Sequence, residues 1–147
     1  GATNWIPPSY SPDYGLFYFP VTESWAMYYT LEMDPRGAMG LGGKAELGLS
    51  NESYLLAVDP VTGKTVWNVH YPTQGGSVAN GVLTTAGRLL FAGDTGGNLV
   101  ARDPANGKPL WHARVGNVSN APQTYLLDGK QYVIVAATDT IYAFRLN

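Results

Sequence analysis

Short apolar segments alternate with turn residues along most of the chain. In its central part, residues 82–85, 88–92, 98–102 and 109–115 are rich in aliphatic and β-branched side chains. Such segments are typical of strands buried between stacked sheets. The breaks between them carry turn formers: Pro104 presets φ, and Gly107 accepts a positive φ. The pattern predicts four short strands within residues 76–117.

One sequence motif occurs twice. Ala-x-Asp-Pro-x-Thr-Gly-Lys-x-x-Trp occupies residues 57–67, and Ala-x-Asp-Pro-x-Asn-Gly-Lys-x-x-Trp follows 44 positions later at residues 101–111. A truncated third copy, Ile-Tyr-Ala-Phe, lies at residues 141–144. A period of about 40–45 residues is typical of the four-stranded blade of a β-propeller.

The flanking regions follow the same plan. In the first unit we expect strands at residues 4–10, 15–20, 54–58 and 65–71, with a Met- and Gly-rich insertion at about 22–51 between the second and the third. Insertions of this kind lie on one face, often the working face. In the last unit we expect strands at residues 122–127, 131–137 and 140–146, with no fourth strand. The predicted fold is therefore all-β, with antiparallel blades at residues 1–75, 76–117 and 118–147.

Three blades do not close a propeller ring. We expect the chain to be the C-terminal piece of a larger propeller, with the missing outer strand supplied by the N-terminus of the whole protein. A different expectation is that three blades complete themselves by homo-oligomerisation through exposed edges. That version predicts an oligomer whose size depends on concentration.

Composition excludes several classes of protein and of binding site. The formal charge of −2 gives no basic footprint for nucleic acid. No apolar run is long enough to span a membrane, and residues 1–5 lack the features of a signal peptide. Because the chain has no cysteine, it has no disulfide, thiolate zinc site or Cys-x-x-Cys-His haem attachment.

The repeated motif resembles the tryptophan-docking motif of the quinoprotein dehydrogenases, the eight-bladed alcohol dehydrogenases that use pyrroloquinoline quinone (PQQ). The resemblance implies that the motif tryptophans fasten neighbouring blades, a role that large aromatics also favour on general grounds. The motif aspartates are expected to accept backbone N–H groups within turns. The structural residues of the motif are Asp59, Gly63, Trp67, Asp103, Gly107 and Trp111.

Other stretches carry the resemblance further. They include Gly-Ala-Thr-Asn-Trp at residues 1–5, Gly-Leu-Phe-Tyr at 15–18, Gly-Val-Leu-Thr-Thr-Ala-Gly at 81–87 and Asp-Gly-Lys-Gln-Tyr-Val at 128–133. The match implies that Asn4, at the start of an inner strand, contacts PQQ; on residue type alone Asn4 is equally a turn residue. Trp5 either lines the pocket floor or fills the core, and large aromatics favour the core.

The chain departs from the family pattern at one place near the cofactor. Where the family often has Trp-Gly-Gly, this chain has Ala79-Asn80-Gly81. Asn80 and Gly81 are therefore candidate cofactor contacts, with Asn80 supplying a polar group in place of the tryptophan.

The resemblance also places the calcium ligands and the catalytic aspartate upstream of this segment, so we expect no catalytic residue and no metal ligand in the chain. The clustered carboxylates Glu23, Glu32 and Asp34 lack the spacing of a calcium loop. His70 and His112 are expected on outer strands, in solvent and far from the axis. Residues 93–97 are expected to form a hairpin rather than a phosphate loop.

Two functions fit the sequence. The first is a segment of a periplasmic PQQ-dependent alcohol dehydrogenase that passes electrons to a separate acceptor such as a cytochrome, both assignments resting on the resemblance. The alternative is a non-catalytic PQQ-repeat propeller that serves as a scaffold for protein partners. The insertion adds Trp25, Met27, Tyr28 and Tyr29, which either flank a substrate funnel or pack against the next blade.

Overall fold

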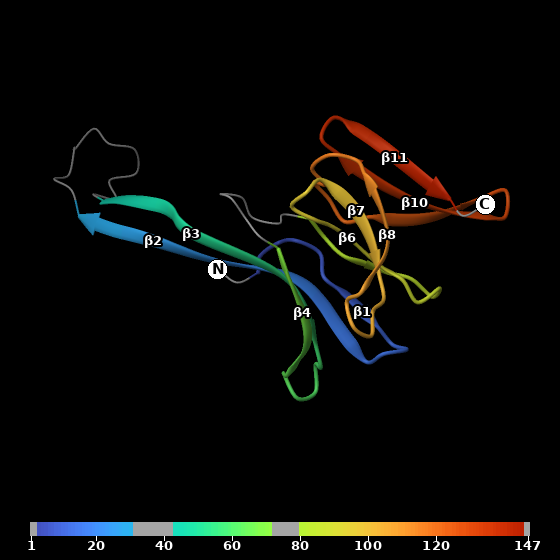
Figure 1. Ribbon diagram of the computed structural model, residues 1–147, viewed down its shortest axis with the longest axis horizontal. Coiled ribbons are helices and arrows are strands. Elements are labelled where there is room, and N and C mark those ends of the chain that lie inside the picture. Colours follow the sequence, from blue (N-terminus) through green and yellow to red (C-terminus); the bar gives the residue numbers. More distant parts are fainter. Residues whose placement is uncertain (1–2, 31–42, 72–79, 146–147) are drawn as a thin grey trace.

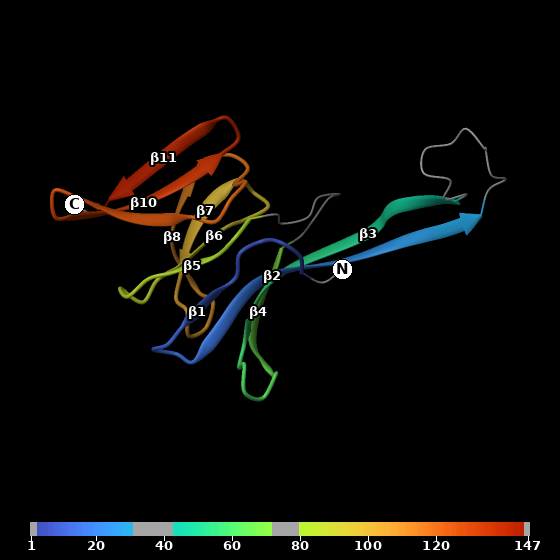
Figure 2. The same ribbon diagram turned by 180° about the vertical axis from the view of Figure 1, so that it is seen from behind.

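The computed structural model describes residues 3–30, 43–71 and 80–145. In these residues eleven β-strands form three antiparallel sheets (Figures 1 and 2). The described residues thus form the antiparallel all-β arrangement that the sequence predicted.

The first sheet has the order β1-β2-β3-β4. Its strands are β1 (Ser9–Ser11), β2 (Leu16–Thr30), β3 (Gly43–Val58) and β4 (Thr65–Tyr71). Each strand pairs antiparallel with the next along the chain, so the sheet is a simple meander.

The second sheet has the order β5-β6-β7-β8. Its strands are β5 (Leu83–Thr84), β6 (Leu90–Gly93), β7 (Asn98–Arg102) and β8 (Pro109–Arg114). They fall within the four segments expected from the pattern, except that β6 reaches Gly93.

The third sheet has three strands, with β10 in the centre. They are β9 (Gln123–Leu127), β10 (Lys130–Ala137) and β11 (Thr140–Arg145). Of the two predicted blade boundaries, the one at residues 75–76 lies outside the described residues, and both stay predictions.

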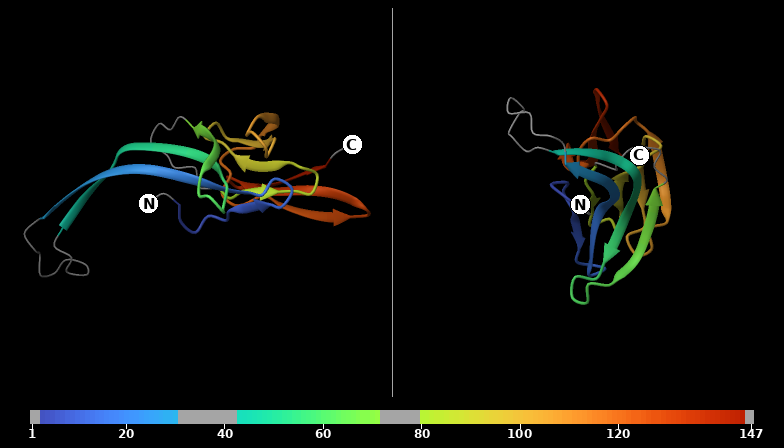
Figure 3. Two further views of the ribbon diagram at one scale, coloured as in Figure 1. Left: turned by 90° about the horizontal axis from the view of Figure 1, so that it is seen from below. Right: turned by 90° about the vertical axis from the view of Figure 1, so that its left-hand side faces the viewer.

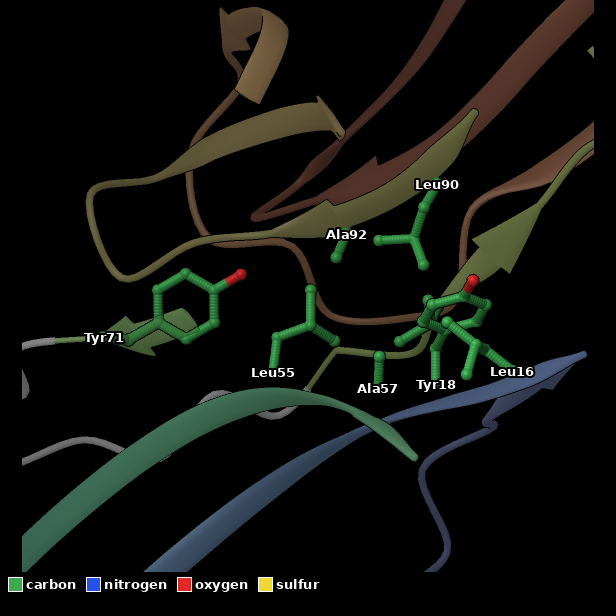
Figure 4. Close-up of a cluster of buried hydrophobic side chains, with 8 residues drawn as sticks. Leu16, Tyr18, Leu55, Ala57, Tyr71, Leu90 and Ala92 are labelled. Atoms are coloured by element: carbon green, nitrogen blue, oxygen red, sulfur yellow. The ribbon is translucent and has the colours of Figure 1, made fainter. Parts of the chain in front are cut away.

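The second sheet lies between the other two, and its central strands β6 and β7 are buried on both faces. Leu90 and Ala92 of β6 face the first sheet, where they meet Leu16, Tyr18, Leu55, Ala57 and Tyr71 (Figure 4). Phe91, between them in sequence, faces the third sheet and packs in a cluster with Val135 and Ala137. Alternate residues of one strand thus enter two separate cores, as the period of two requires, and this explains why β6 reads as a continuous apolar run.

The strands expected at residues 15–20 and 54–58 are longer in the structure, so both ends of the predicted insertion at residues 22–51 are formed by strands. Residues 22–30 continue β2, and residues 43–51 begin β3, so the two strands form one long hairpin that projects away from the three sheets (Figures 1 and 3). The expected strand ended at Pro20, and proline cannot donate a hydrogen bond to a strand ladder. Proline is tolerated there because β1 pairs only with Leu16–Tyr18, which leaves one edge of β2 without a strand partner at that point.

The predicted inner strand at residues 4–10 is also shorter in the structure. The chain from Thr3 to Pro8 is irregular, and β1 begins only at Ser9. Two adjacent prolines, Pro7 and Pro8, lack backbone N–H groups, so they cannot continue a ladder toward Asn4.

No helix among the described residues has the length and apolar character that would let it cross a membrane.

Candidate functional site

The candidate site lies where the innermost strands of the three sheets begin. β1 and β5 run side by side: the Val82 N–H donates to the Pro7 carbonyl at 3.1 Å, and the hydroxyls of Ser9 and Thr84 are 2.6 Å apart. The chain before β1 and the chain before β5 therefore emerge at the same end of the molecule. The long β2–β3 hairpin projects from this end too, since β2 extends past Tyr18, the partner of Ser9.

Gly81 joins all three inner strands at this end. A Cβ placed on Gly81 would lie 2.5 Å from the Cβ of Ala121 and 3.1 Å from the carbonyl oxygen of Pro7. Only glycine permits such a close approach. We call Pro7, Gly81 and Ala121 the inner-strand junction. In the structure, Gly81 brings three backbone segments together. Pro7 and Ala121 were not identified as site residues from the sequence, because they are remote from Gly81 along the chain.

Asn80 is buried, with 4% of its surface exposed, and its side chain is held by the second sheet. The Gly93 N–H donates to its Oδ1 at 2.8 Å. The Oδ1 atom is thus committed to the last residue of β6, and any hydrogen bond from this side chain to a ligand has to come from the Nδ2 amide. This is a different setting from the open cofactor contact that the sequence suggested.

Asn4 and Trp5 precede the junction and are exposed. Trp5 has 72% of its surface accessible, so the expectation that it fills the core is wrong for the chain as described. Asn4 lies in the irregular segment rather than at the start of an inner strand. Its amide and the Trp5 indole therefore remain available at the end of the molecule where the junction lies.

The repeated motif fastens the first sheet to the second. The Trp67 Nε1–H donates to the Pro104 carbonyl at 2.9 Å, and the buried Tyr18 hydroxyl donates to the same oxygen at 3.0 Å. The Trp67 ring covers Gly107, where a Cβ would lie 2.9 Å from ring atom Cε3. The two carbonyl contacts and the glycine place the turn between β7 and β8 directly on the outer strand of the first sheet.

Each motif aspartate organises its own turn. Asp59 Oδ1 accepts the Val61 and Thr62 N–H groups at 2.8 and 3.2 Å, and Asp103 Oδ1 accepts the Ala105 N–H at 2.9 Å. The two backbone N–H groups lower the pKa of Asp59, because they favour its charged form. These carboxylates are used within their turns, which leaves them poorly suited to act as bases.

The other glycine and the other tryptophan of the motif, Gly63 and Trp111, make no equivalent contact among the described residues. Gly63 has φ +70°, close to the +74° of Gly107, yet no described atom lies within 4 Å of a Cβ built on it. Trp111 makes an edge contact with Phe144 at 5.3 Å between ring centroids. The stack of sheets therefore has an open docking turn at one end, around Gly63.

Two buried tyrosines have shifted ionisation. Burial, then Tyr14 and Asp103, raises the pKa of Tyr18 from 10.0 to about 12. Burial also raises the pKa of Tyr71, against the opposing effect of the Arg102 guanidinium, whose Cζ lies 5.8 Å from the Tyr71 ring centroid. Both phenols lie in the packing between the first and second sheets and stay neutral at physiological pH.

The described carboxylates and imidazoles do not gather into a metal site: no three His, Asp or Glu side chains come together in this part of the chain. Of the cluster considered in the sequence, Glu23 is exposed, whereas Glu32 and Asp34 lie outside the described residues. His70 is exposed and pairs with Glu52, and His112 is exposed on β8. The hairpin expected at residues 93–97 is the turn between β6 and β7.

The exposed groups beside the junction suit part of a large polar quinone. The Asn4 amide offers a donor to a carbonyl or carboxylate oxygen, and the Trp5 indole offers a flat face and an N–H. The described residues supply no cluster of three metal-ligating side chains. An amide donor and an indole ring are the chemical groups that one side of such a site requires.

A family model described as outer membrane protein assembly factor BamB, the PQQ_2 family, matches residues 51–147. Among relatives, the chain is 40% identical over 144 residues to the quinoprotein alcohol dehydrogenase PedH of Pseudomonas putida, covering 93% of this chain and 23% of the relative. It is also 40% identical over 146 residues to a 1-butanol dehydrogenase (quinone) of Thauera butanivorans, covering 92% of this chain and 22% of the relative.

Solved structures give the same result. The quinohemoprotein alcohol dehydrogenase of Comamonas testosteroni superposes with a TM-score of 0.81 at 33% identity, covering 93% of this chain and 22% of that one. A europium-containing methanol dehydrogenase superposes with a TM-score of 0.76 at 32% identity, covering 92% of this chain and 24% of that one. The likeness confirms the all-β fold of propeller blades, and the chain spans less than a quarter of the length of these four proteins.

Proposed function

The chain belongs to the PQQ_2 repeat family, and from that membership we propose that it serves as a C-terminal segment of a quinoprotein alcohol dehydrogenase. The observation that carries the proposal is the pair of exposed side chains, Asn4 and Trp5, beside the inner-strand junction. A packing-only propeller has no need of an exposed amide and indole at this place. The relatives that match along nine-tenths of the chain are alcohol dehydrogenases by name, which supports the same substrate class.

In this proposal the chain provides one wall of the cofactor pocket. The Asn4 amide donates to an oxygen of PQQ, and the Trp5 ring covers part of its apolar surface. Asn80 contributes its Nδ2 amide, while its Oδ1 stays bonded to Gly93. Gly81 holds the three inner strands close enough to form a continuous wall.

When bound, PQQ supplies a quinone that takes up two electrons from the alcohol. The base that removes the hydroxyl proton and the calcium or other metal ion that polarises the quinone are assigned to the part of the protein outside this chain. The described carboxylates support that division: Asp59 and Asp103 are bound in turns, and the others form no metal-binding group.

The remaining assignments follow from the same resemblance. The rest of the propeller is the immediate partner, packing on the open faces of the first and third sheets. A primary alcohol or a related small molecule is the substrate, a separate protein such as a cytochrome takes the electrons, and the protein works in the periplasm.

A second candidate is supported by the family model itself, whose description names an outer-membrane assembly factor rather than an enzyme. In that case the repeat would stack blades for protein partners, and Asn4 would have no ligand. The docking of Trp67 on Gly107 is equally compatible with both functions, because it concerns only how blades stack.

The experiment that separates the two uses the complete protein containing this sequence, loaded with PQQ and calcium. Asn4→Ala is expected to weaken PQQ retention several-fold and to slow dye-linked alcohol oxidation. Asn117→Ala, an exposed asparagine before β9, serves as the matched control and should change neither. Equal PQQ affinity in the parent and in Asn4→Ala would remove Asn4 from the site.

A further inference from the structure

The projecting part of the β2–β3 hairpin stands apart from the rest of the molecule (Figures 1 and 3). β4 ends at Tyr71, which pairs with Ser53, and β1 pairs with β2 only as far as Tyr18. Among the described residues, 23–30 and 43–52 therefore have only each other as strand partners. We call these two segments the arm.

One side of the arm carries large apolar groups in solvent. Trp25 is 70% exposed and Met27 is 55% exposed, and they occupy alternate positions of β2. Phe17, Phe19, the buried Val21 and the exposed Glu23 precede them at the same parity, so this face of the strand is apolar except for one carboxylate between Val21 and Trp25. This is the face of the first sheet that is turned away from the second sheet, because the intervening Tyr18 packs with Leu90 and Ala92.

A two-stranded hairpin alone is marginally stable in water. Large apolar side chains that are exposed at alternate positions of one strand, as Trp25 and Met27 are, mark a candidate interaction site. The second sheet shows what such a face normally meets: both of its faces are covered by a neighbouring sheet. The outward face of the first sheet is built alike, with Phe17, Phe19 and Leu56 only half-buried.

We propose that the arm is a clasp for the neighbouring blade of the same protein: its Trp25 and Met27 pack on the sheet that covers the outward face of the first sheet. The occupant follows from continuity, since the clasp residues extend the same strand face on which that sheet would stack. The proposal rests on the larger propeller of the proposed function but not on its chemistry. The chain spans about a fifth of its relatives' length, which leaves ample chain to supply such a blade.

The arm also projects from the end of the sheets where Asn4, Trp5 and Asn80 lie. A clasp at that end holds two blades together beside the inner-strand junction, where a change in blade spacing would alter the cofactor wall.

Hydroxyl-radical footprinting tests the clasp directly, because tryptophan and methionine side chains are readily oxidised when exposed. Oxidation of Trp25 and Met27 in the complete protein is read by mass spectrometry in the folded state and in the urea-unfolded state. We expect both residues to be oxidised several-fold more slowly in the folded state. Equal rates in the two states would overturn the proposal, as would protection that grows with protein concentration, which would indicate a second copy as the occupant.

The identity of the occupant is tested with benzoylphenylalanine in place of Trp25. Photo-crosslinking within the complete protein should join position 25 to the blade that precedes this chain in the same molecule. A crosslink to another molecule, or to a distant part of the propeller, would contradict the assignment.

A charge-insertion pair provides the energetic test. Met27→Glu should lower the unfolding midpoint of the complete protein, because it buries a carboxylate in the clasp. Ser24→Glu places the same charge on the opposite, exposed face of the same strand and should have little effect. Equal changes of the unfolding midpoint in the two variants would contradict the proposal. Both footprint and midpoint can be read whether or not the protein oxidises alcohols, so the two proposals fail separately.

Discussion

The indole of Trp67 and the carbonyl of Pro104 are joined by a hydrogen bond of 2.9 Å that links the outer strand of the first sheet to the β7–β8 turn of the second. The same carbonyl oxygen accepts the hydroxyl of the buried Tyr18, so one atom of a turn receives two side chains from the neighbouring sheet. The turn keeps its shape because Asp103 holds it from within. The repeated motif thus couples the local geometry of a turn to the stacking of whole sheets.

The two motif glycines provide a matched test of that stacking. Gly63→Ala and Gly107→Ala both place a side chain at φ near +70°, which costs about 1–2 kcal/mol by backbone strain alone. Gly107→Ala additionally pushes its Cβ against the Trp67 ring, 2.9 Å away, whereas the space around Gly63 is open. In the isolated chain, urea unfolding should therefore show a clearly larger loss of stability for Gly107→Ala. Equal losses would mean that the tryptophan contact does not constrain the turn.

Asn80 should matter for stability as well as for any ligand. Removing its side chain leaves the buried Gly93 N–H without its acceptor, which costs about 1–3 kcal/mol. Asn80→Ala is expected to show that loss in denaturant unfolding, and the exposed Asn117→Ala is expected to stay close to the parent. A stability of Asn80→Ala equal to that of the parent would show that the hydrogen bond is replaced by another acceptor.

Tyr18 predicts how the chain responds to alkaline pH. Its folded-state pKa of about 12 lies above the ordinary value of 10.0, so the folded chain holds the phenolic proton more tightly than the unfolded chain. The stability linked to this proton is complete below pH 10 and is lost as the pH rises from 10 toward 12. Tyr18→Phe removes the linkage and the bond to Pro104, costing about 1 kcal/mol near neutral pH. Its free energy of unfolding should then fall less steeply than that of the parent above pH 10; parallel profiles would contradict this.

Arg102 is the only buried charged side chain among the described residues, at 7% exposure, and its Nε atom has no hydrogen-bond partner there. One guanidinium N–H donates to the Gly107 carbonyl at 3.0 Å. The first copy of the motif has Val58 at this position, so the setting accepts an apolar residue. Arg102→Met should leave stability unchanged or raise it by about 1–4 kcal/mol, as replacement of poorly compensated buried charge often does.

The same variant has a spectroscopic consequence. Since the Arg102 guanidinium opposes the effect of burial on Tyr71, its removal should raise the pKa of Tyr71 further. Ultraviolet titration of Arg102→Met against the parent would detect that shift. A stability loss of more than about 2 kcal/mol would instead indicate that the bond to Gly107 outweighs the buried charge.

The strands of the second sheet were predictable because their apolar residues are bounded by unambiguous turn formers such as Pro104 and Gly107. The long hairpin was not recovered, although Trp25, Tyr28 and Tyr29 are residue types that favour strands. Pro20 and the glycine- and methionine-rich stretch after Thr30 contain residue types that disfavour strands, and they obscure that signal. Pro7 and Pro8 predict that β1 begins only after them, whereas the sequence interpretation expected a strand from residue 4.

The candidate site residues could be predicted from residue type and from the family resemblance, whereas the residues that contact them could not. Nothing local in the sequence connects Gly81 with Ala121, or Asn80 with the N–H of Gly93, because these partners lie 13 to 40 positions away and meet only when the sheets stack. Long-range contacts of this kind depend on the register and twist of whole sheets, which local patterns do not encode. The exposure of Trp5 is a further case, since a tryptophan by type favours burial.

The central claim is tested most directly by assaying the complete protein for PQQ-dependent alcohol oxidation. The protein is purified without cofactor, then supplied with PQQ and calcium or another metal ion, a small primary alcohol and an artificial electron-accepting dye. The account predicts dye reduction that requires both PQQ and alcohol and that is slowed in Asn4→Ala. Failure to retain PQQ and to reduce dye with a series of alcohols and metal ions would contradict the account and favour a scaffold.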